Sequence, residues 1–396
     1  MKNIEYKGLT FLFTVDNGFS FDARLNIRFK AGIVKNIGKE LSAMGIKNVL
    51  IVTDPGVLKV KLHENLVTTL NQENIKFEVF SEVEPNPRDT TCEKAAEFAK
   101  ELNVDAVIGI GGGSSLDTAK CVGFLMTNPG RVKDYDGSGK VKNEPIPIIA
   151  IPTTAGTGSE VTANAAITDT EKHIKMSVRS PKIIPHLAVL DPELLKTLPQ
   201  HIAAFSAMDA LIHAIESFLS RRATAFSDYF NLKAIELLSK YIRPFYAEPS
   251  NTEAAGNMLI GSMLAGLGIS NTGTGNAHAL GRVLGGSYDM AHGLACSVVF
   301  PYVLKFNAMA QPQKFVEIAR AMDLKTEGLN EKEIGQKVVR EIYELLRELN
   351  IPVKLSELNV TKESFNDMVK VAITNVAPNP RKTTEVDLVS ILEEAF

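Results

Sequence analysis

The sequence predicts a protein of two parts: an N-terminal α/β dinucleotide-binding domain with a parallel, Rossmann-like sheet, followed by an all-α domain. In the first half, short apolar runs alternate with helical stretches, which is typical of a parallel sheet covered by helices. From about Pro192 onward, long amphipathic stretches follow one another without a convincing strand. A chain of 396 residues, 45% of them hydrophobic, is long enough to bury two cores. We therefore place the domains at residues 1–190 and 191–396.

Short apolar runs mark the strands of the first half. Residues 91–102 between them have apolar side chains at helical spacing. The charged segment 128–144 contains Asn-Pro-Gly and Asp-Gly-Ser-Gly and is predicted to be a solvent-exposed connection. The predicted strands lie at residues 10–15, 25–29, 49–54, 76–80, 104–110, 146–151 and 187–190.

The predicted helix over residues 205–218 carries Asp209 and His213 four positions apart, and therefore on one face. Its other residues are mainly apolar, so this face is expected to turn inward. A divalent metal would satisfy a buried carboxylate and imidazole together. The alternative is an Asp–His pair on the helix surface. Further helices are predicted at residues 224–246, 253–267, 313–322 and 331–349.

Two more histidines, His278 and His292, have small and apolar neighbours rather than charged ones. A lone histidine of this kind is usually a core residue. With Asp209 and His213, however, they supply one oxygen and three nitrogens. That set suits Fe(II) or Zn(II) and leaves room for a substrate oxygen.

Two loops rich in small residues follow predicted strands. Gly111-Gly-Gly113-Ser114-Ser opens a helix whose free N–H groups suit a pyrophosphate, and Ser114 or Ser115 is expected to cap it. The second loop, residues 152–162, is dense in Gly, Thr and Ser. Either loop can also be an ordinary turn. Asp54 ends its strand, where a carboxylate can bind the adenosine ribose of NAD and repel the 2′-phosphate of NADP. The alternative is an Asp that initiates the Pro-Gly turn.

The chain resembles the iron-containing (group III) alcohol dehydrogenase family over nearly its whole length, with the dehydroquinate-synthase-like architecture of that superfamily. Both characteristic regions of the family are recognisable: Ala188-Val-Leu-Asp191, Pro199, Ser206, Asp209 and Glu216, then the stretch from His278 to His292-Gly293.

The resemblance assigns the metal ligands to Asp209, His213, His278 and His292. It implies that the first glycine loop binds the cofactor diphosphate and that the second closes over the nicotinamide. Asn164 and Lys175 are then expected near the nicotinamide ribose and substrate, and Asn86 near the adenosine. The cofactor residues implied are Asp54, Asn86, Gly112, Gly113, Ser114, Asp117, Thr153, Thr154, Ser159, Thr162, Asn164 and Lys175.

The expected reaction is hydride transfer between NAD(H), favoured over NADP(H), and a small primary alcohol or diol or its aldehyde, with Fe(II) or Zn(II) as Lewis acid. Alternatives are a relative acting on an anionic substrate, such as a hydroxyacid–oxoacid transhydrogenase or a semialdehyde reductase, and a dehydroquinate-synthase-like lyase. One position departs from the family: Arg282, four residues after His278, stands where many members have histidine. We expect its fixed charge to bind the cofactor diphosphate or an anionic substrate. The alternative is a local ion pair with Asp289.

Composition excludes other classes of partner. The net charge is −3 and no basic run is present, so no nucleic-acid partner is expected. No apolar run approaches the roughly 18 residues that span a bilayer. The N-terminus lacks the apolar core of a signal peptide, and three scattered cysteines suit a reducing cytoplasm. Relatives pair their N-terminal strands across a two-fold axis, which implies a homodimer or a higher homo-oligomer.

Overall fold

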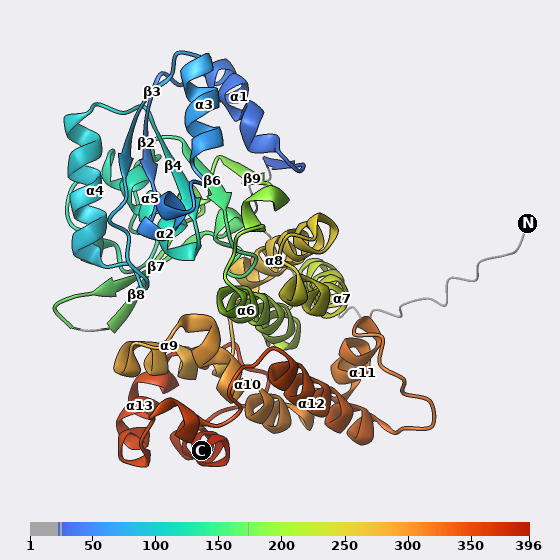
Figure 1. Ribbon diagram of the computed structural model, residues 1–396. Helices are drawn as coiled ribbons and strands as arrows, with labels where there is room; N and C mark the ends of the chain where they lie inside the picture. The colour runs from blue at the N-terminus through green and yellow to red at the C-terminus, as the bar shows by residue number, and fades with distance from the viewer. Residues whose placement is uncertain (1–22, 24–25, 173) are drawn as a thin grey trace, which may run out of the picture.

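A six-stranded parallel sheet forms the centre of the N-terminal half of the computed structural model (Figure 1). The structure describes residue 23, residues 26–172 and residues 174–396. The strand order is β1-β9-β6-β4-β2-β3. The strands are β1 (Ile27–Phe29), β2 (Asn48–Val52), β3 (Lys76–Phe80), β4 (Ala106–Gly111), β6 (Ile148–Pro152) and β9 (Leu187–Leu190).

Both faces of this sheet are covered, which explains why its central strands are continuous apolar runs. Successive side chains of β2 alternate between the two faces: Val49 and Ile51 pack with α1 (Ile37–Ala43) and α3 (Glu64–Gln72). Leu50 and Val52 pack on the other face with α4 (Asp89–Glu101) and α5 (Gly113–Leu125).

The direction of winding reverses between β2 and β4. The chain passes from β2 outward to the edge strand β3, then returns to place β4 on the other side of β2. At such a point the two connections leave to opposite faces and open a crevice at the carboxyl ends of the strands, where open α/β sheets bind ligands. Asp54 and the glycine loop of residues 111–113 follow β2 and β4 at this edge.

The second half consists of helices, as expected. Helix α6 packs against α7, α8 and α10, and every one of its residues from Ala207 to Leu219 is buried. By length and composition it is the one helix in the described ranges that could cross a membrane, but it lies in the protein core. The helices are α6 (Gln200–Leu219), α7 (Ala225–Ala247), α8 (Thr252–Thr272), α9 (Asn276–Tyr288), α10 (His292–Ala308), α11 (Pro312–Ala321), α12 (Glu331–Glu348), α13 (Phe365–Ala372) and α14 (Glu385–Ala395).

One apolar cluster joins the halves. It runs from the α1/α3 face of the sheet through α6 to side chains of α14. Figure 1 shows α6 and α8 directly below the carboxyl edge of the sheet, with α9, α10 and α13 beyond α6. The edge of the sheet that carries the glycine loop therefore faces the helix that carries Asp209 and His213.

The strand expected at residues 10–15 lies outside the described residues, as do residues 24 and 25 of the strand expected at 25–29. The other predicted strands form within a few residues of their expected positions. The segment 128–144 connects α5 to β6 and is exposed at most of its positions, as predicted, but it is not exposed throughout. Val132 and Tyr135 are buried in the apolar cluster on the α4/α5 face of the sheet, and Gly137–Ser138 forms strand β5.

A second, three-stranded sheet was not predicted. Its order is β5-β8-β7, with β7 (Asn164–Asp169) and β8 (Ile174–Arg179) antiparallel. In β8, the apolar residues Met176 and Val178 alternate with Lys175, Ser177 and Arg179. This period of two is the pattern of a half-buried strand and would have revealed it.

Candidate functional site

Asp209, His213, His278 and His292 come together from three helices. Asp209 and His213 project from α6, His278 lies on the first turn of α9, and His292 begins α10. One oxygen of Asp209, Oδ1, is 3.5 Å from His278 Nε2 and 3.8 Å from His292 Nε2. The other, Oδ2, is 3.8 Å from His213 Nδ1. The His213 and His278 rings stack with centroids 4.3 Å apart.

Glu216 orients His278 from the opposite side of its ring. The Glu216 Oε2 atom is 2.7 Å from His278 Nδ1, and the carboxylate also accepts the backbone N–H groups of Gly275 and Ala277 at 2.8 and 2.7 Å. A carboxylate is acceptor-only, so Nδ1 carries the hydrogen and donates it to Glu216. In the neutral imidazole, Nε2 of His278 is then the lone pair, and it is turned toward Asp209.

Two buried atoms at the centre that could bind a metal lack hydrogen-bond partners. Asp209 Oδ1 and His278 Nε2 are both buried and form no hydrogen bond, although such groups are costly to leave unpaired. Oxygen and imidazole nitrogen together are the donors that Fe(II) and Zn(II) bind. The residues present therefore fit a divalent metal of this kind.

Two close contacts attach this centre to its surroundings. His213 Nδ1 is 3.3 Å from the carbonyl oxygen of Gly156, in the loop that follows β6. If Nδ1 donates to that carbonyl, Nε2 of His213 is also left as a lone pair. Gly293, next to His292, lies so close to α6 that an added Cβ would be 2.1 Å from the Phe205 carbonyl oxygen. Only glycine allows α10 to begin this near α6, which accounts for the His-Gly pair.

Cys296 is a residue of the site that the sequence analysis missed. Its ligand atom lies within 4.8 Å of those of Asp209, His278 and His292, and its Sγ is 3.8 Å from His292 Nε2. Because it follows His292 by four residues on α10, helical spacing would have pointed to it. Burial raises the pKa of the Cys296 thiol well above its usual range. A neutral thiol is a poor ligand, since the thiolate is the form that binds metals.

Burial and mutual charge shape the protonation of the set. Burial lowers the pKa of His213 to about 4 and that of His292 well below its usual range, although Asp209 opposes both shifts. For His278, burial is outweighed by Asp209 and Glu216, which raise the pKa to about 9. Burial favours the neutral form of Asp209, but the neighbouring imidazoles hold its pKa below the usual value. Without a metal, the centre therefore combines an ionised carboxylate with two neutral imidazoles and a protonated His278, whose Nε2 proton must leave before that nitrogen can bind a metal.

The glycine loop opens α5 at the carboxyl edge of the sheet. Gly112 is the residue before the helix and forms no side-chain cap. The prediction that Ser114 or Ser115 caps α5 is wrong, because both lie inside the helix, and Ser115 instead lies 3.2 Å from Asp54 Oδ2. The N–H groups of the first turn of α5 are thus left without a side-chain cap. Such a turn is a binding place for an anion such as a diphosphate.

Asp54 itself has a local structural role. Its Oδ1 accepts the N–H of Val57 at 3.1 Å and caps the short helix α2 (Pro55–Lys59). This agrees with the turn-initiating alternative. Among the described residues, each of its oxygens has one hydrogen-bond partner, Val57 for Oδ1 and Ser115 for Oδ2, and a carboxylate oxygen can accept further hydrogen bonds.

Other predicted cofactor residues form an internal network behind the loops. Asp117 accepts the hydroxyl of Ser159 at 2.5 Å and the N–H of Ala166 at 2.9 Å. The fully buried Lys120 donates to Thr162 at 3.1 Å and to the Asn164 carbonyl at 2.7 Å. Thr153 is bonded through its N–H to the Gly111 carbonyl, at 2.9 Å. Thr154 lies against Gly112, so the two loops meet at this edge.

Asn86, Asn164 and Lys175 are brought together with Arg282 around β8. Lys175 donates to Asn86 Oδ1 at 2.6 Å, and Asn164 pairs with Ser177. The α9 helix, which carries Arg282, packs against β8. Arg282 forms no ion pair with Asp289 or with any other residue that the structure describes; Asp289 is exposed and ends α9 in the left-handed conformation. The alternative of a local Arg282–Asp289 pair is therefore wrong.

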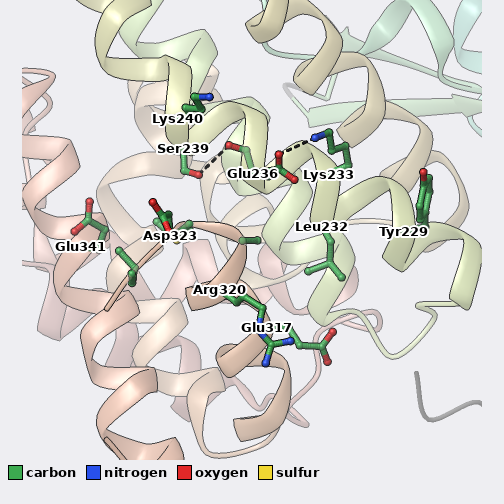
Figure 2. Close-up of a pocket in the computed structure, with 13 residues that line it drawn as sticks. Tyr229, Leu232, Lys233, Glu236, Ser239, Lys240, Glu317, Arg320, Asp323 and Glu341 are labelled. Atoms are coloured by element: carbon green, nitrogen blue, oxygen red, sulfur yellow. Dashed lines mark hydrogen bonds and ion pairs between the residues drawn. The ribbon is translucent and has the colours of Figure 1, made fainter. Parts of the chain in front are cut away.

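A groove elsewhere on the molecule contains none of these residues. It has a volume of about 840 Å³ and lies between α7, α11 and α12 (Figure 2). Its charged side chains, among them Lys233, Glu236 and Arg320, come from these helices. It lacks histidine and cysteine, and we assign it no part in the site.

Comparison with known proteins identifies the family. Residues 25–192 match the model of the iron-containing alcohol dehydrogenases, and residues 203–396 match the C-terminal model of the same family. The NAD-dependent methanol dehydrogenase of Bacillus methanolicus is 34% identical over 92% of this chain and 96% of its own length. The choline dehydrogenase of Bacillus subtilis is 36% identical over 92% of each chain.

Solved structures agree with these matches. The crystal structure of a 1,3-propanediol oxidoreductase superposes with a TM-score of 0.93 and 33% identity, covering 96% of this chain and 100% of the other. Both family models, the sequence relatives and the fold thus agree over nearly the whole chain. The chain belongs to the iron-containing alcohol dehydrogenase family and is a nicotinamide-dependent oxidoreductase.

Proposed function

We propose that Asp209, His213, His278 and His292 hold one divalent metal, Fe(II) in preference to Zn(II), for an alcohol–aldehyde oxidoreductase reaction. One observation carries the proposal: Asp209 Oδ1 and His278 Nε2 face one another, 3.5 Å apart, buried and without hydrogen bonds. A metal ion bound between these two atoms and the other imidazoles explains why they are buried without hydrogen-bond partners.

The surrounding residues keep this centre organised. Glu216 holds His278 by its Nδ1–H, and the Gly156 carbonyl holds His213 on its Nδ1 side. Groups bonded to the far nitrogen of a ligating histidine fix its orientation and raise its basicity. When bound, the metal supplies Lewis acidity at the substrate oxygen, and the nicotinamide accepts or supplies the hydride. Burial of Asp209 and His278 keeps water from these atoms, which strengthens their electrostatic interactions.

We propose that the cofactor lies along the carboxyl edge of β2, β4 and β6, with its diphosphate at the start of α5. The uncapped N–H groups after Gly112 and Gly113, with the Ser114 hydroxyl, support this placement. The loop that contains Thr153 and Thr154 continues to Gly156, whose carbonyl oxygen contacts His213. The nicotinamide side is bordered by Asn86, Asn164 and Lys175. Asp117, Ser159 and Thr162 hold these loops from behind. Asp54 favours NAD(H) over NADP(H) by repelling a 2′-phosphate.

The substrate is a small alcohol or the corresponding aldehyde. Relatives are named for methanol, choline and 1,3-propanediol, which share a primary hydroxyl but differ in size and charge. The common reaction therefore extends to this chain, while the rest of the substrate depends on side chains of its own pocket.

Location and assembly complete the proposal. The chain has three free cysteines, all buried, which suits the reducing cytoplasm. The outer edge of β1 has no partner strand within the described residues, which suits pairing with a second copy in a homodimer.

The test is a turnover assay with anaerobically purified, Fe(II)-loaded protein. Short primary alcohols with NAD, and their aldehydes with NADH, are followed by absorbance of the reduced cofactor. We expect turnover with at least one pair, its loss on removal of metal with a chelator, and recovery on adding Fe(II). Turnover that survives complete metal removal would contradict the proposed centre.

A further inference from the structure

Three cationic residues lie on two elements that pack together beside the metal ligands: Lys175 and Arg179 on β8, and Arg282 on α9. Lys175 and Arg179 are four residues apart on a strand and so lie on the same face, with Ser177 between them. The helix α9 packs on this strand, and Arg282 lies one turn beyond His278. Arg282 is partly buried.

The three charges act on one another. Burial, and next the charge of Arg179, lower the pKa of Arg282. Burial, and next the charge of Arg282, lower the pKa of Lys175. Arg282 follows the proposed ligand His278 by one turn of α9, which places the cluster next to the metal ligands.

No carboxylate among the described residues pairs with this cluster. Lys175 donates to the neutral Asn86 amide, and Arg179 Nε donates to the Ser177 hydroxyl at 3.0 Å. Arg282 forms no hydrogen bond or ion pair within those residues. The acids nearby have other partners: Asp209 belongs to the metal site, Asp117 accepts from Ser159 and Ala166, and Asp136 accepts the backbone N–H of Ser177. Glu216 is bonded to His278 and to backbone N–H groups.

Lys175 and Arg282 are partly buried and Arg179 is exposed beside them, and like charges at partly buried positions are unfavourable unless an anion is bound near them. We propose that Lys175, Arg179 and Arg282 form an anion-binding subsite, and that the preferred substrate is a small aldehyde or alcohol bearing a carboxylate or sulfonate. Arginine is suited to this task because its planar guanidinium binds such groups in a bidentate manner. The inference rests on the proposed function, since the reactive end of the substrate must reach the Asp209 and histidine cluster.

The experiment compares matched aldehydes on the Fe(II)-loaded enzyme with NADH. Butanal and 4-oxobutanoate have the same number of carbons and differ in the carboxylate, and propanal and 2-sulfoacetaldehyde provide a second pair. Each is measured on wild type, Arg282→Gln, Arg282→Lys and Arg179→Gln. Arg320→Gln, an exposed arginine of α11 in the distant groove, controls for net charge. The KM for NADH is measured with the neutral aldehyde.

We expect wild type to prefer at least one anionic aldehyde over its neutral partner. Arg282→Gln is expected to lose roughly ten- to a hundred-fold in kcat/KM for that anionic substrate, with butanal little changed. Arg282→Lys should recover only part of the loss, and Arg179→Gln, on an exposed strand position, should show a smaller loss of the same selectivity.

Three results would overturn the subsite. They are no anionic preference in wild type, an equal loss on neutral and anionic aldehydes, or an effect confined to the KM for NADH, which would place the charge at the cofactor. A second readout separates this failure from failure of the proposed function. Calorimetric binding of 4-hydroxybutyrate to the enzyme–NAD complex should weaken in Arg282→Gln even if no aldehyde is turned over. Unchanged binding there would also contradict the proposal.

Discussion

Glu216 is the residue on which the orientation of His278 depends most directly. Its carboxylate accepts from His278 and from two backbone N–H groups, so all of its contacts need an acceptor. In Glu216→Gln, the amide nitrogen would face one of these donors, and the negative charge behind His278 would be lost.

We therefore expect Glu216→Gln to weaken Fe(II) or Zn(II) binding by about ten- to a hundred-fold, the usual effect of losing such a partner. Competition against a chelator of known affinity measures this, and circular dichroism checks the fold. Glu236→Gln, an exposed residue of α7, is the control for the loss of one carboxylate. A metal affinity equal to wild type in a folded Glu216→Gln would show that Glu216 does not act through His278.

At the scale of residues, the sequence predicted four side chains that lie together in the structure, but not the residues that hold them in place. Asp209 and His213 are recognisable because four-residue spacing on an apolar helix places both on one face. Glu216 appeared only as part of a familiar pattern, because its partner His278 is 62 positions away and no local rule connects them. Cys296 was missed although its spacing from His292 is helical.

Glu160, in the short helix Ser159–Val161, makes the stability of its loop depend on pH. Burial raises the pKa of Glu160 from 4.5 to about 7, although its own backbone N–H and the charge of Lys120 oppose the shift. A raised carboxyl pKa means that the folded state holds its proton more tightly than the unfolded state between these values. Stability from this group therefore falls as pH rises from about 4.5 to about 7, and then stays level.

Glu160→Gln removes this dependence. For the metal-free proteins, the free energy of unfolding of the variant minus that of wild type should increase between pH 5 and pH 8 by about 3 kcal/mol. Lys120 keeps its contact with Asp117 at 3.3 Å in the variant. Urea denaturation at several pH values measures the difference, with Glu236→Gln as the exposed control. A difference that stays constant with pH would contradict the predicted protonation of Glu160.

Asp54 joins the end of β2 to the start of α2, and its cap can be separated from its charge. Asparagine caps helices as well as aspartate does, so Asp54→Asn should preserve the bond to Val57 and lose only the charge. We expect the ratio of kcat/KM for NADP to that for NAD to rise roughly ten-fold or more. Asp54→Gly should raise the same ratio and also destabilise α2. An unchanged ratio in both variants would leave Asp54 as a helix cap alone.

At the level of elements, strands with a strong apolar pattern were predicted correctly, and strands with a weak pattern were missed. The central strands are buried on both faces, and their continuous apolar runs predicted them. The β7–β8 hairpin has one polar face, and its six-residue strands give a weaker signal. The missing cap of α5 was also not predicted, because serines near a helix start suggest capping without showing where the helix begins.

The assembly follows from the edge of the whole sheet. The strand β1 has β9 on one side and no described partner on the other, and its Phe29 is 45% exposed. Open edges invite pairing with another chain. We expect light scattering at micromolar concentration to give a mass of twice 43.1 kDa or a higher multiple. A monomer under those conditions would contradict the homodimer.

The division of the whole molecule was predicted from the change of pattern near Pro192, and the boundary at residue 190 stays a prediction. The approach of the two halves was not predictable from either pattern. It depends on contacts such as that of His213 with Gly156, 57 residues away, and on the apolar cluster that passes from the sheet into α6. Contacts of this kind come from packing, which local periodicity does not encode.

The metal content of anaerobically purified protein tests the central claim most directly. Wild type should carry about one Fe(II) or Zn(II) per chain, whereas His278→Ala and His292→Ala should lose most of the metal and nearly all turnover while remaining folded. His201→Ala, an exposed histidine on the same helix as Asp209, should keep both. Normal metal content and turnover in either His278→Ala or His292→Ala would contradict the account.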